Sequence, residues 1–336
     1  MVIFMKNIIK FPEPVSIIQS ASVVGKLEHE GPLGQYFDMY EDDIYFGKDS
    51  WEKAESEMCR RTLSTLLAKA NMKYIDLDLV LAGDLLNQCI ASSFGLLDCN
   101  APFLGLYGAC STFAEGVIIG SNLCSTHQID RCAALASSHF CSSERQFRFP
   151  IEYGGQRTPT SQNTVTGCGA FLLECTGYPP YITECVIGRI VDSGIKDQNN
   201  MGAAMAPATV DTLMRYFNDS GKSANDFDII STGDLGKEGY EIACELLYKN
   251  RLDMWGKYTD CGMLMYDYKK QDVNSGASGC GCSAAIAASY FIDKLKNGCK
   301  DILLIGTGAL LSPVSVLQKQ NIPAVAHLIH ISNSRN

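Results

Sequence analysis

The chain has 336 residues, of which 46% are hydrophobic and 19% charged, and its formal net charge is −9. A chain of this length and composition can bury a large core. Its acidic balance, without any run of basic residues, argues against a nucleic-acid partner. The 15 cysteines follow neither a disulfide framework nor a zinc-ligand spacing, so we expect free thiols in a reducing compartment.

The sequence predicts no membrane-spanning segment. The longest apolar runs, such as residues 284–288 and 302–305, are far shorter than the roughly 20 residues that a transmembrane helix needs. The first residues are apolar, but Lys6 and Asn7 interrupt them and no small-residue cleavage site follows. We therefore expect neither a signal peptide nor a transmembrane span, and partner proteins would hold the chain at any membrane where it acts.

The first strongly patterned segment is an amphipathic helix. Residues 51–71 place apolar side chains on one face, and Asn71 is suited to the position at which a helix stops. The next segment, residues 75–85, has an aspartate-rich turn followed by a short apolar strand and a polar loop. Together they predict a helix that crosses over to a buried strand.

The chain repeats this pattern. Residues 75–85 (IDLDLVLAGDL) match residues 225–235 (NDFDIISTGDL), including the pairs Asp76/Asp226, Asp78/Asp228 and Asp84/Asp234. Two further matches keep the same order: Ala109-Cys110-Ser111 with Gly281-Cys282-Ser283, and strand 131–139 with strand 300–309. Buried apolar strands that alternate with helices indicate parallel strands. We therefore predict two duplicated α/β halves, residues 1–176 and 177–336, divided near the TGYPPY segment.

Residues 105–116 (GLYGACSTFAEG) predict a turn from a short buried strand into a helix, with Cys110 at the turn. Ser111 and Thr112 are residues that favour helix N-caps. Backbone N–H groups and the positive end of a helix dipole favour a thiolate at such a place, which makes Cys110 a candidate nucleophile. The alternative is that this thiol only fills the core.

Ligands in parallel α/β sheets bind beyond the carboxyl ends of the strands. That rule places six residues on one candidate rim, namely Asp84, Cys110, His139, Thr232, Asp234 and Thr307. A long irregular segment, residues 142–164, adds three arginines that suit carboxylate recognition, Arg145, Arg148 and Arg157. The alternative for these arginines is a solvated loop in which they pair with Glu144 and Glu152.

These features resemble a known superfamily. Duplicated α/β halves with a cysteine at the first strand–helix turn resemble the thiolase superfamily, and ketoacyl synthase III in particular. The resemblance to the stage V sporulation protein AD family is closer, because its sequence blocks occur in order along nearly the whole chain. These blocks are GPLGQYFD (31–38), LAGDLLNQ (81–88), GACST (108–112), SSERQFRFPIEYGGQ (142–156), TVTGCGA (164–170), MGAAMAPA (201–208), STGDL (231–235) and GTGALLSP (306–313).

The resemblance implies a thiolase-like fold with α-β-α-β-α layers. It also implies a soluble subunit, peripheral to the inner spore membrane, of the channel complex that moves dipicolinate (pyridine-2,6-dicarboxylate) in sporulation and germination. That family is taken to bind the dicarboxylate itself, while integral-membrane subunits of the complex carry out transport. Because thiolase-like proteins pair through the strand before the first turn, the resemblance further implies a homodimer. It implies no cofactor.

Three departures from condensing enzymes favour binding over catalysis. Those enzymes carry a His-Gln-Ala-Asn block where this chain has Ser231-Thr232-Gly233-Asp234, and an Asn where it has Gly279-Cys280-Gly281-Cys282. Thiolases carry a second cysteine in a late loop, where this chain has Gly306-Thr307-Gly308. The donors that stabilise an enolate oxyanion are therefore missing. Two alternatives stay open, an acyl transferase with Cys110 as thioester nucleophile, and a structural subunit with a vestigial pocket.

For a dicarboxylate ligand, we assign six binding residues: Cys110, His139, Asp84, Arg148, Thr232 and Thr307. Cys110 would form the pocket floor near helix N–H groups, and His139 as an imidazolium would pair with a carboxylate, unless it is a core histidine. Asp84 and Asp234 would approach each other across the pseudo-twofold axis, or else cap their own loops. A calcium ion held with the ligand between these two aspartates is the boldest hypothesis.

Overall fold

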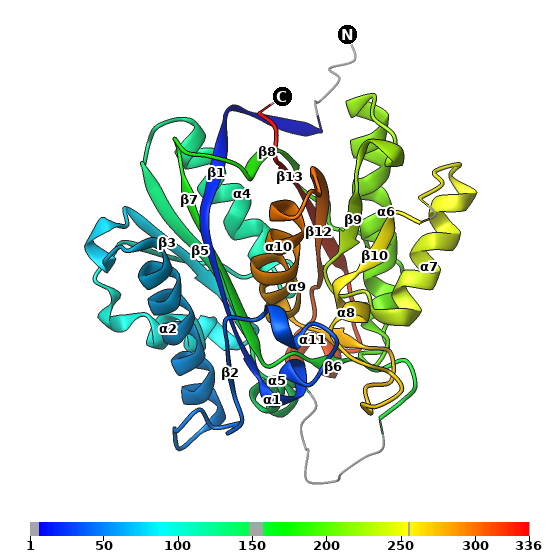
Figure 1. The fold of residues 1–336 in the computed structure, drawn as a ribbon. Helices are drawn as coiled ribbons and strands as arrows, with labels where there is room; N and C mark the ends of the chain where they lie inside the picture. Colours follow the sequence, from blue (N-terminus) through cyan, green and yellow to red (C-terminus); the bar gives the residue numbers. More distant parts are fainter. Residues whose placement is uncertain (1–6, 148–156, 255, 336) are drawn as a thin grey trace.

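One mixed sheet runs through the described part of the chain, residues 7–147, 157–254 and 256–335 of a computed structural model (Figure 1). Within these ranges it has 11 strands, in the order β10-β9-β12-β13-β8-β1-β7-β5-β3-β4, with β2 paired to β1. A separate small sheet pairs β11 with β6. The strands are β1 (Ile8–Gly25), β2 (Met39–Glu41), β3 (Leu79–Gly83), β4 (Phe103–Gly105), β5 (Arg131–Ser138), β6 (Asn163–Thr164), β7 (Gly167–Glu174), β8 (Tyr181–Val186), β9 (Ile229–Thr232), β10 (Tyr258–Asp260), β11 (Ala277–Ser278), β12 (Asp301–Ala309) and β13 (Ala324–Ser332).

The strand order is the same in the two parts of the sheet. In the first part, β4, β3 and β5 are parallel, and β7 and β1 continue the sheet in antiparallel fashion. In the second part, β10, β9 and β12 are parallel, followed by antiparallel β13 and β8. The two parts join where β1 pairs antiparallel with β8. The predicted thiolase-like fold of duplicated α/β halves is confirmed.

Helices form layers on both faces of the sheet (Figure 1). α4 and α9 pack between the two halves, where α4 contacts both β5 and β12, while α2 covers the first half and α6 with α7 covers the second. Three buried apolar clusters fill the spaces between these layers. The helices are α1 (Lys26–His29), α2 (Trp51–Ala70), α3 (Ile90–Gly95), α4 (Thr112–Ser125), α5 (Phe140–Phe147), α6 (Met201–Ser220), α7 (Gly236–Lys249), α8 (Cys261–Leu264), α9 (Cys280–Ile286), α10 (Ile292–Lys296) and α11 (Pro313–Leu317).

The repeated aspartates Asp78 and Asp228 perform the same task in the two halves. The Asp78 carboxylate accepts from the backbone N–H groups of Asp130 and Arg131, at the start of β5. The Asp228 carboxylate accepts in the same way from Lys300 and Asp301, at the start of β12. Each aspartate therefore ties the beginning of one central strand to the beginning of its parallel neighbour.

Two local predictions have opposite outcomes. The predicted helix over residues 51–71 is α2, and Asn71 ends it in the left-handed conformation with φ 55°. The predicted buried strand before Cys110 is wrong, because β4 forms the edge of the sheet and leaves Phe103 40% and Leu104 47% exposed. The apolar side chains of this strand therefore lie at the surface of the protein.

The described helices include none with the length and apolar character needed to cross a lipid bilayer. All 15 cysteines are free thiols, and most of them are buried. A reduced cysteine behaves as a small apolar side chain in a core. Burial therefore explains why the cysteines do not follow the spacing of a disulfide framework.

The contact between α9 and β7 predicts a matched pair of glycine variants. A Cβ atom at Gly169 would lie 2.0 Å from the backbone oxygen of Ala284, whereas one at Gly116 in α4 would approach nothing closer than 3.4 Å. We expect Gly169→Ala to lower the free energy of unfolding by about 3 kcal/mol, because the backbone of α9 must shift. Gly116→Ala should raise it by roughly 0.5–1 kcal/mol, since alanine favours a helix interior. Urea denaturation measures both, and equal stabilities would contradict this packing.

Candidate functional site

The turn that carries Cys110 is built by hydroxyl groups. The Ser111 hydroxyl donates to the Gly108 carbonyl at 2.6 Å, and the Thr112 hydroxyl donates to the Ala109 carbonyl at 2.7 Å. Ala109 adopts a left-handed φ of 50°, which is uncommon for a residue with a side chain. These bonds hold Cys110 at the end of the turn, directly before Ser111, the N-cap residue of α4.

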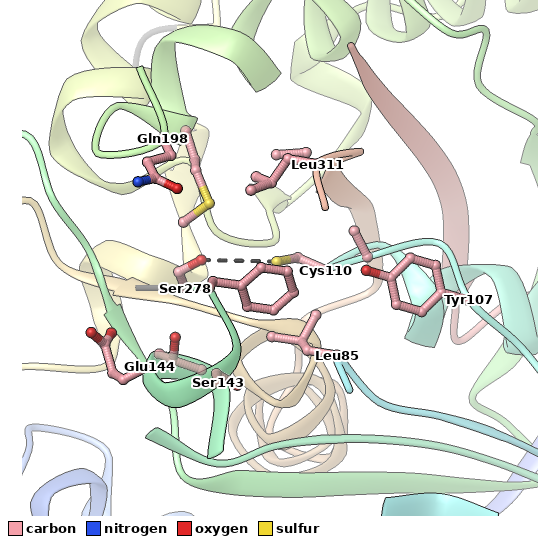
Figure 2. Close-up of a pocket in the computed structure, with 13 residues that line it drawn as sticks. Leu85, Tyr107, Cys110, Ser143, Glu144, Gln198, Ser278 and Leu311 are labelled. Carbon is pink, nitrogen blue, oxygen red and sulfur yellow. Dashed lines mark hydrogen bonds between the residues drawn. The ribbon is translucent and has the colours of Figure 1, made fainter. Parts of the chain in front are cut away.

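A cavity of about 50 Å³ lies over Cys110, and both halves of the chain line it (Figure 2). Its walls are mainly apolar, with a few neutral polar groups and one carboxylate. The lining residues are Leu85, Tyr107, Ala109, Cys110, Ser143, Glu144, Phe147, Thr164, Gln198, Met201, Ser278, Ala309 and Leu311. An apolar pocket with a few polar groups is typical of small-molecule sites.

The buried carboxylate of Asp234 organises the floor of this cavity. One oxygen accepts from the Thr307 hydroxyl at 2.6 Å. The other accepts from the Ser278 hydroxyl at 3.0 Å and from the Gly279 N–H at 2.9 Å. The Cys110 sulfur lies 3.8 Å from the Ser278 hydroxyl oxygen, as the dashed line in Figure 2 shows. Of the predicted rim, the structure therefore brings Cys110, Asp234 and Thr307 together.

The thiol of Cys110 is not activated. Burial and the neighbouring Asp234 carboxylate raise its pKa well above the usual value of a cysteine. The position before a helix predicted a favoured thiolate, but the loss of hydration and the nearby carboxyl group outweigh the helix N–H groups. At neutral pH, Cys110 is a neutral thiol.

His139 lies outside the lining of the cavity. One ring nitrogen is 2.8 Å from the Ile44 carbonyl oxygen, and the other accepts from the Cys141 N–H. This pairing requires a proton on the first nitrogen only, and burial lowers the pKa of the ring. The imidazolium that was predicted to pair with a ligand carboxylate is therefore disfavoured, and His139 is a core histidine.

Asp84 and Thr232 are also not among the residues that line the cavity. The Asp84 carboxylate accepts from the Leu86 N–H and from the N–H and hydroxyl of Ser92, which closes the loop after β3. The Thr232 hydroxyl donates to Asp260 at 2.6 Å. Asp84 and Asp234 thus share no partner, and in the described ranges no group of three metal-ligating side chains could hold an ion.

The arginines have different surroundings. Arg157 pairs with Glu144 and packs over the Phe140 ring. The pairing with Glu144 is one of those expected from the alternative interpretation of this segment as a solvated loop. Arg145 pairs with Glu52 and stacks on Trp51. Arg148 lies outside the described residues.

Several lining residues were not predicted from the sequence, among them Ser143, Phe147, Gln198, Met201 and Ser278. Ser143 and Phe147 stand one helical turn apart in α5, directly after β5, so the rule about strand ends pointed to their region. Met201 begins a sequence block that supported the family resemblance but received no role. Ser278 follows an apolar alanine in a two-residue strand, a context without a functional signal.

Comparison with known protein families decides the assignment. The model of the family described as stage V sporulation protein AD matches residues 5–332. The chain belongs to this family of sporulation proteins. Stage V sporulation protein AD of Bacillus subtilis (strain 168) is 40% identical to it over 318 residues, which cover 94% of each chain.

Solved structures support the fold. Cerulenin-bound OleA of Xanthomonas campestris has a TM-score of 0.62 at 12% identity and covers 96% of this chain and 100% of its own. 3-Oxoacyl-[acyl-carrier-protein] synthase III of Aquifex aeolicus VF5 has a TM-score of 0.57 at 12% identity, with coverages of 95% and 99%. At such identities these likenesses establish the thiolase-like fold alone.

The environment of Cys110 predicts slow alkylation. Each pH unit between the ambient pH and a higher pKa lowers the thiolate fraction about tenfold, and the thiolate is the reactive form. We expect iodoacetamide at pH 7.5 to modify Cys110 at least roughly tenfold more slowly than a free cysteine. Site-resolved peptide mass spectrometry of the native protein measures this rate, with denatured protein as the fully reactive control. Labelling of Cys110 at the rate of free cysteine would show an activated nucleophile instead.

Proposed function

We propose that this protein binds dipicolinate in the cavity over Cys110, without catalysing a reaction, as a subunit of a channel complex that moves dipicolinate in sporulation and germination. The observation that carries the proposal is a predominantly apolar cavity between the two halves, with an unactivated thiol at its floor, in a member of this sporulation family.

The lining chemistry suits an aromatic acid. Leu85, Phe147 and Leu311 offer apolar contact to the faces of a flat ring. Polar groups on Ser143, Gln198 and other lining residues offer hydrogen bonds to carboxylate oxygens. An apolar cavity with polar groups around it therefore supports this ligand class.

The cavity volume requires side-chain movement on binding. At about 50 Å³ it is smaller than the roughly 150 Å³ that holds a benzene molecule. Met201 has an unbranched, adaptable side chain, and Gln198 is only partly buried, so rotamer changes at these two residues would enlarge the space. The described lining also contains no cationic side chain that could neutralise the dianion. We therefore include a calcium ion, bound together with the ligand, in the test of the proposal.

The lack of activation at Cys110 supports a non-enzymatic role. An acyl transferase needs a thiolate, and both burial and Asp234 oppose it here. The fold is shared with condensing enzymes, so the alternative function is acyl transfer through Cys110. Iodoacetamide-sensitive turnover of an acyl-CoA thioester would support that alternative.

For partners, we propose integral-membrane subunits of the same complex, which would place the protein against the inner spore membrane, and a second copy of this chain. The position of β4 supports the homodimer, because among the described strands it is the last of the sheet and exposes Phe103 and Leu104 at that edge. Phe94 and Leu97, 62% and 71% exposed, add apolar surface in the same region of the sequence.

The edge strand generates a prediction about assembly. We expect the purified protein to sediment as a dimer and Leu104→Lys to sediment as a monomer, because a buried lysine would oppose pairing of the two edges. Tyr248→Lys replaces another exposed side chain, 76% accessible, on α7 and should leave the dimer intact. Analytical ultracentrifugation distinguishes these species, and a wild-type monomer would refute the proposed dimer.

The binding proposal is tested by calorimetric titration with dipicolinate, with and without equimolar calcium. We expect saturable binding to the wild type, no comparable affinity for a pyridine monocarboxylate, and several-fold weaker binding to Cys110→Ala. Cys185→Ala removes the same sulfur atom from a buried position in β8 outside the cavity lining, and it should bind as the wild type does. Absence of saturable binding under both calcium conditions would overturn the proposal.

A further inference from the structure

The hydroxyl group of Ser143 is buried and has no hydrogen-bond partner among the described residues. The residue is only 2% exposed, so its hydroxyl has lost most of its contact with bulk water. A buried hydroxyl without a partner is energetically unfavourable, and such groups are uncommon in native proteins. This one requires an explanation.

Two other buried hydroxyls, on Ser121 and Thr209, are also without a partner in these ranges. Neither of them lines the cavity over Cys110, whereas Ser143 does. Ser143 therefore combines an unused hydrogen-bonding group with an open space in front of it. The pair Ser143 and Ser121 also provides a matched comparison, because each is a serine inside a helix with its hydroxyl unpaired.

Ser143 offers a hydroxyl proton that has no partner among the described residues, and the hydroxyl of Ser278 does not. The Ser278 hydroxyl already gives its proton to Asp234, which leaves only its oxygen directed at the Cys110 thiol. The side chain of Glu144, the neighbour of Ser143, is engaged in an ion pair with Arg157. Among these polar groups, the Ser143 hydroxyl is the one whose proton is available to an incoming acceptor.

The position of Ser143 suits contact with one end of a flat ligand. Helix α5 presents Ser143 and Phe147 on one face, since residues four apart lie above one another. In Figure 2, Ser143 lies on one side of the Cys110–Ser278 pair and Gln198 on the other. A ring packed against Phe147 would therefore bring a substituent at its edge to the Ser143 hydroxyl.

We propose that Ser143 is a specificity-determining residue, whose hydroxyl donates a hydrogen bond to one carboxylate oxygen of the aromatic dicarboxylate. The assignment rests on the proposed function of this cavity. The group recognised is an anionic oxygen at the edge of the ring, and the residue that binds it lies in α5. The unpaired Ser143 hydroxyl is then part of a binding site whose hydrogen bonds are completed by the ligand.

The test compares Ser143→Ala and Ser121→Ala with the wild type by calorimetric titration with dipicolinate. A hydrogen bond to a charged group is worth about 1.5–3 kcal/mol, so we expect Ser143→Ala to bind roughly 10- to 100-fold more weakly. Ser121→Ala should bind as the wild type does. Because neither substitution removes a hydrogen bond within the described protein, both variants should melt at or above the wild-type temperature, which separates lost affinity from lost folding.

The possible results are distinguishable. If the wild type binds no dipicolinate, the proposed function fails and the role of Ser143 fails with it. If the wild type binds and Ser143→Ala binds equally well, only the role of Ser143 is overturned. Equal weakening by Ser143→Ala and Ser121→Ala, or a lower melting temperature for Ser143→Ala alone, would show a structural effect and also overturn it.

Discussion

The hydrogen bonds to the buried Asp234 carboxylate are the interaction on which the candidate site depends. Thr307 reaches it from β12, and Ser278 and Gly279 reach it from β11 and the start of α9. These donors offset much of the free energy that burial of a carboxylate costs. The same carboxylate sets the position of Ser278 beside Cys110 and raises the pKa of the thiol. This carboxylate therefore shapes the cavity floor, and it adds to the burial that raises the pKa of the Cys110 thiol.

The duplicated halves diverge at this position alone among the three aspartate pairs. Asp76 and Asp226 each accept from a backbone N–H three residues earlier, and Asp78 and Asp228 each bind the start of the next central strand. Asp84, the counterpart of Asp234, instead closes its own loop through Leu86 and Ser92. The first two aspartate pairs therefore stabilise the same backbone turns in both halves. The third pair differs, and only its member Asp234 contributes to the candidate site.

Local sequence patterns predicted elements whose stability is decided locally. The helix α2, its end at Asn71 and the repeated aspartate turns depend on periodicity and on contacts within a few residues. The fold also followed from the order of repeated blocks, because parallel strands in duplicated halves allow few topologies. By contrast, the apolar β4 was predicted as buried, since composition does not distinguish an interior strand from an apolar sheet edge.

The site was only partly predictable, because strand ends specify a region and not the direction of each side chain. Cys110 and Thr307 lie at the predicted rim and meet around Asp234, while His139 and Asp84 turn into their own hydrogen-bond networks. The position of Cys110 was predicted, but its protonation state was not. A helix terminus can be read from sequence, whereas the burial that opposes a thiolate depends on the complete fold.

The ligand would be recognised mainly by neutral groups, and this suits a protein that passes its ligand on. In the described lining, Glu144 is the single charged side chain, and it is already paired with Arg157. An arginine clamp would bind a carboxylate bidentately and strongly. Hydrogen bonds from a serine hydroxyl and an amide, together with apolar contact to the ring, discriminate by shape and acceptor position at a lower total affinity. In the proposed function, a subunit that releases dipicolinate to a membrane channel would need that balance, and a neutral thiol would leave the bound ligand chemically unchanged.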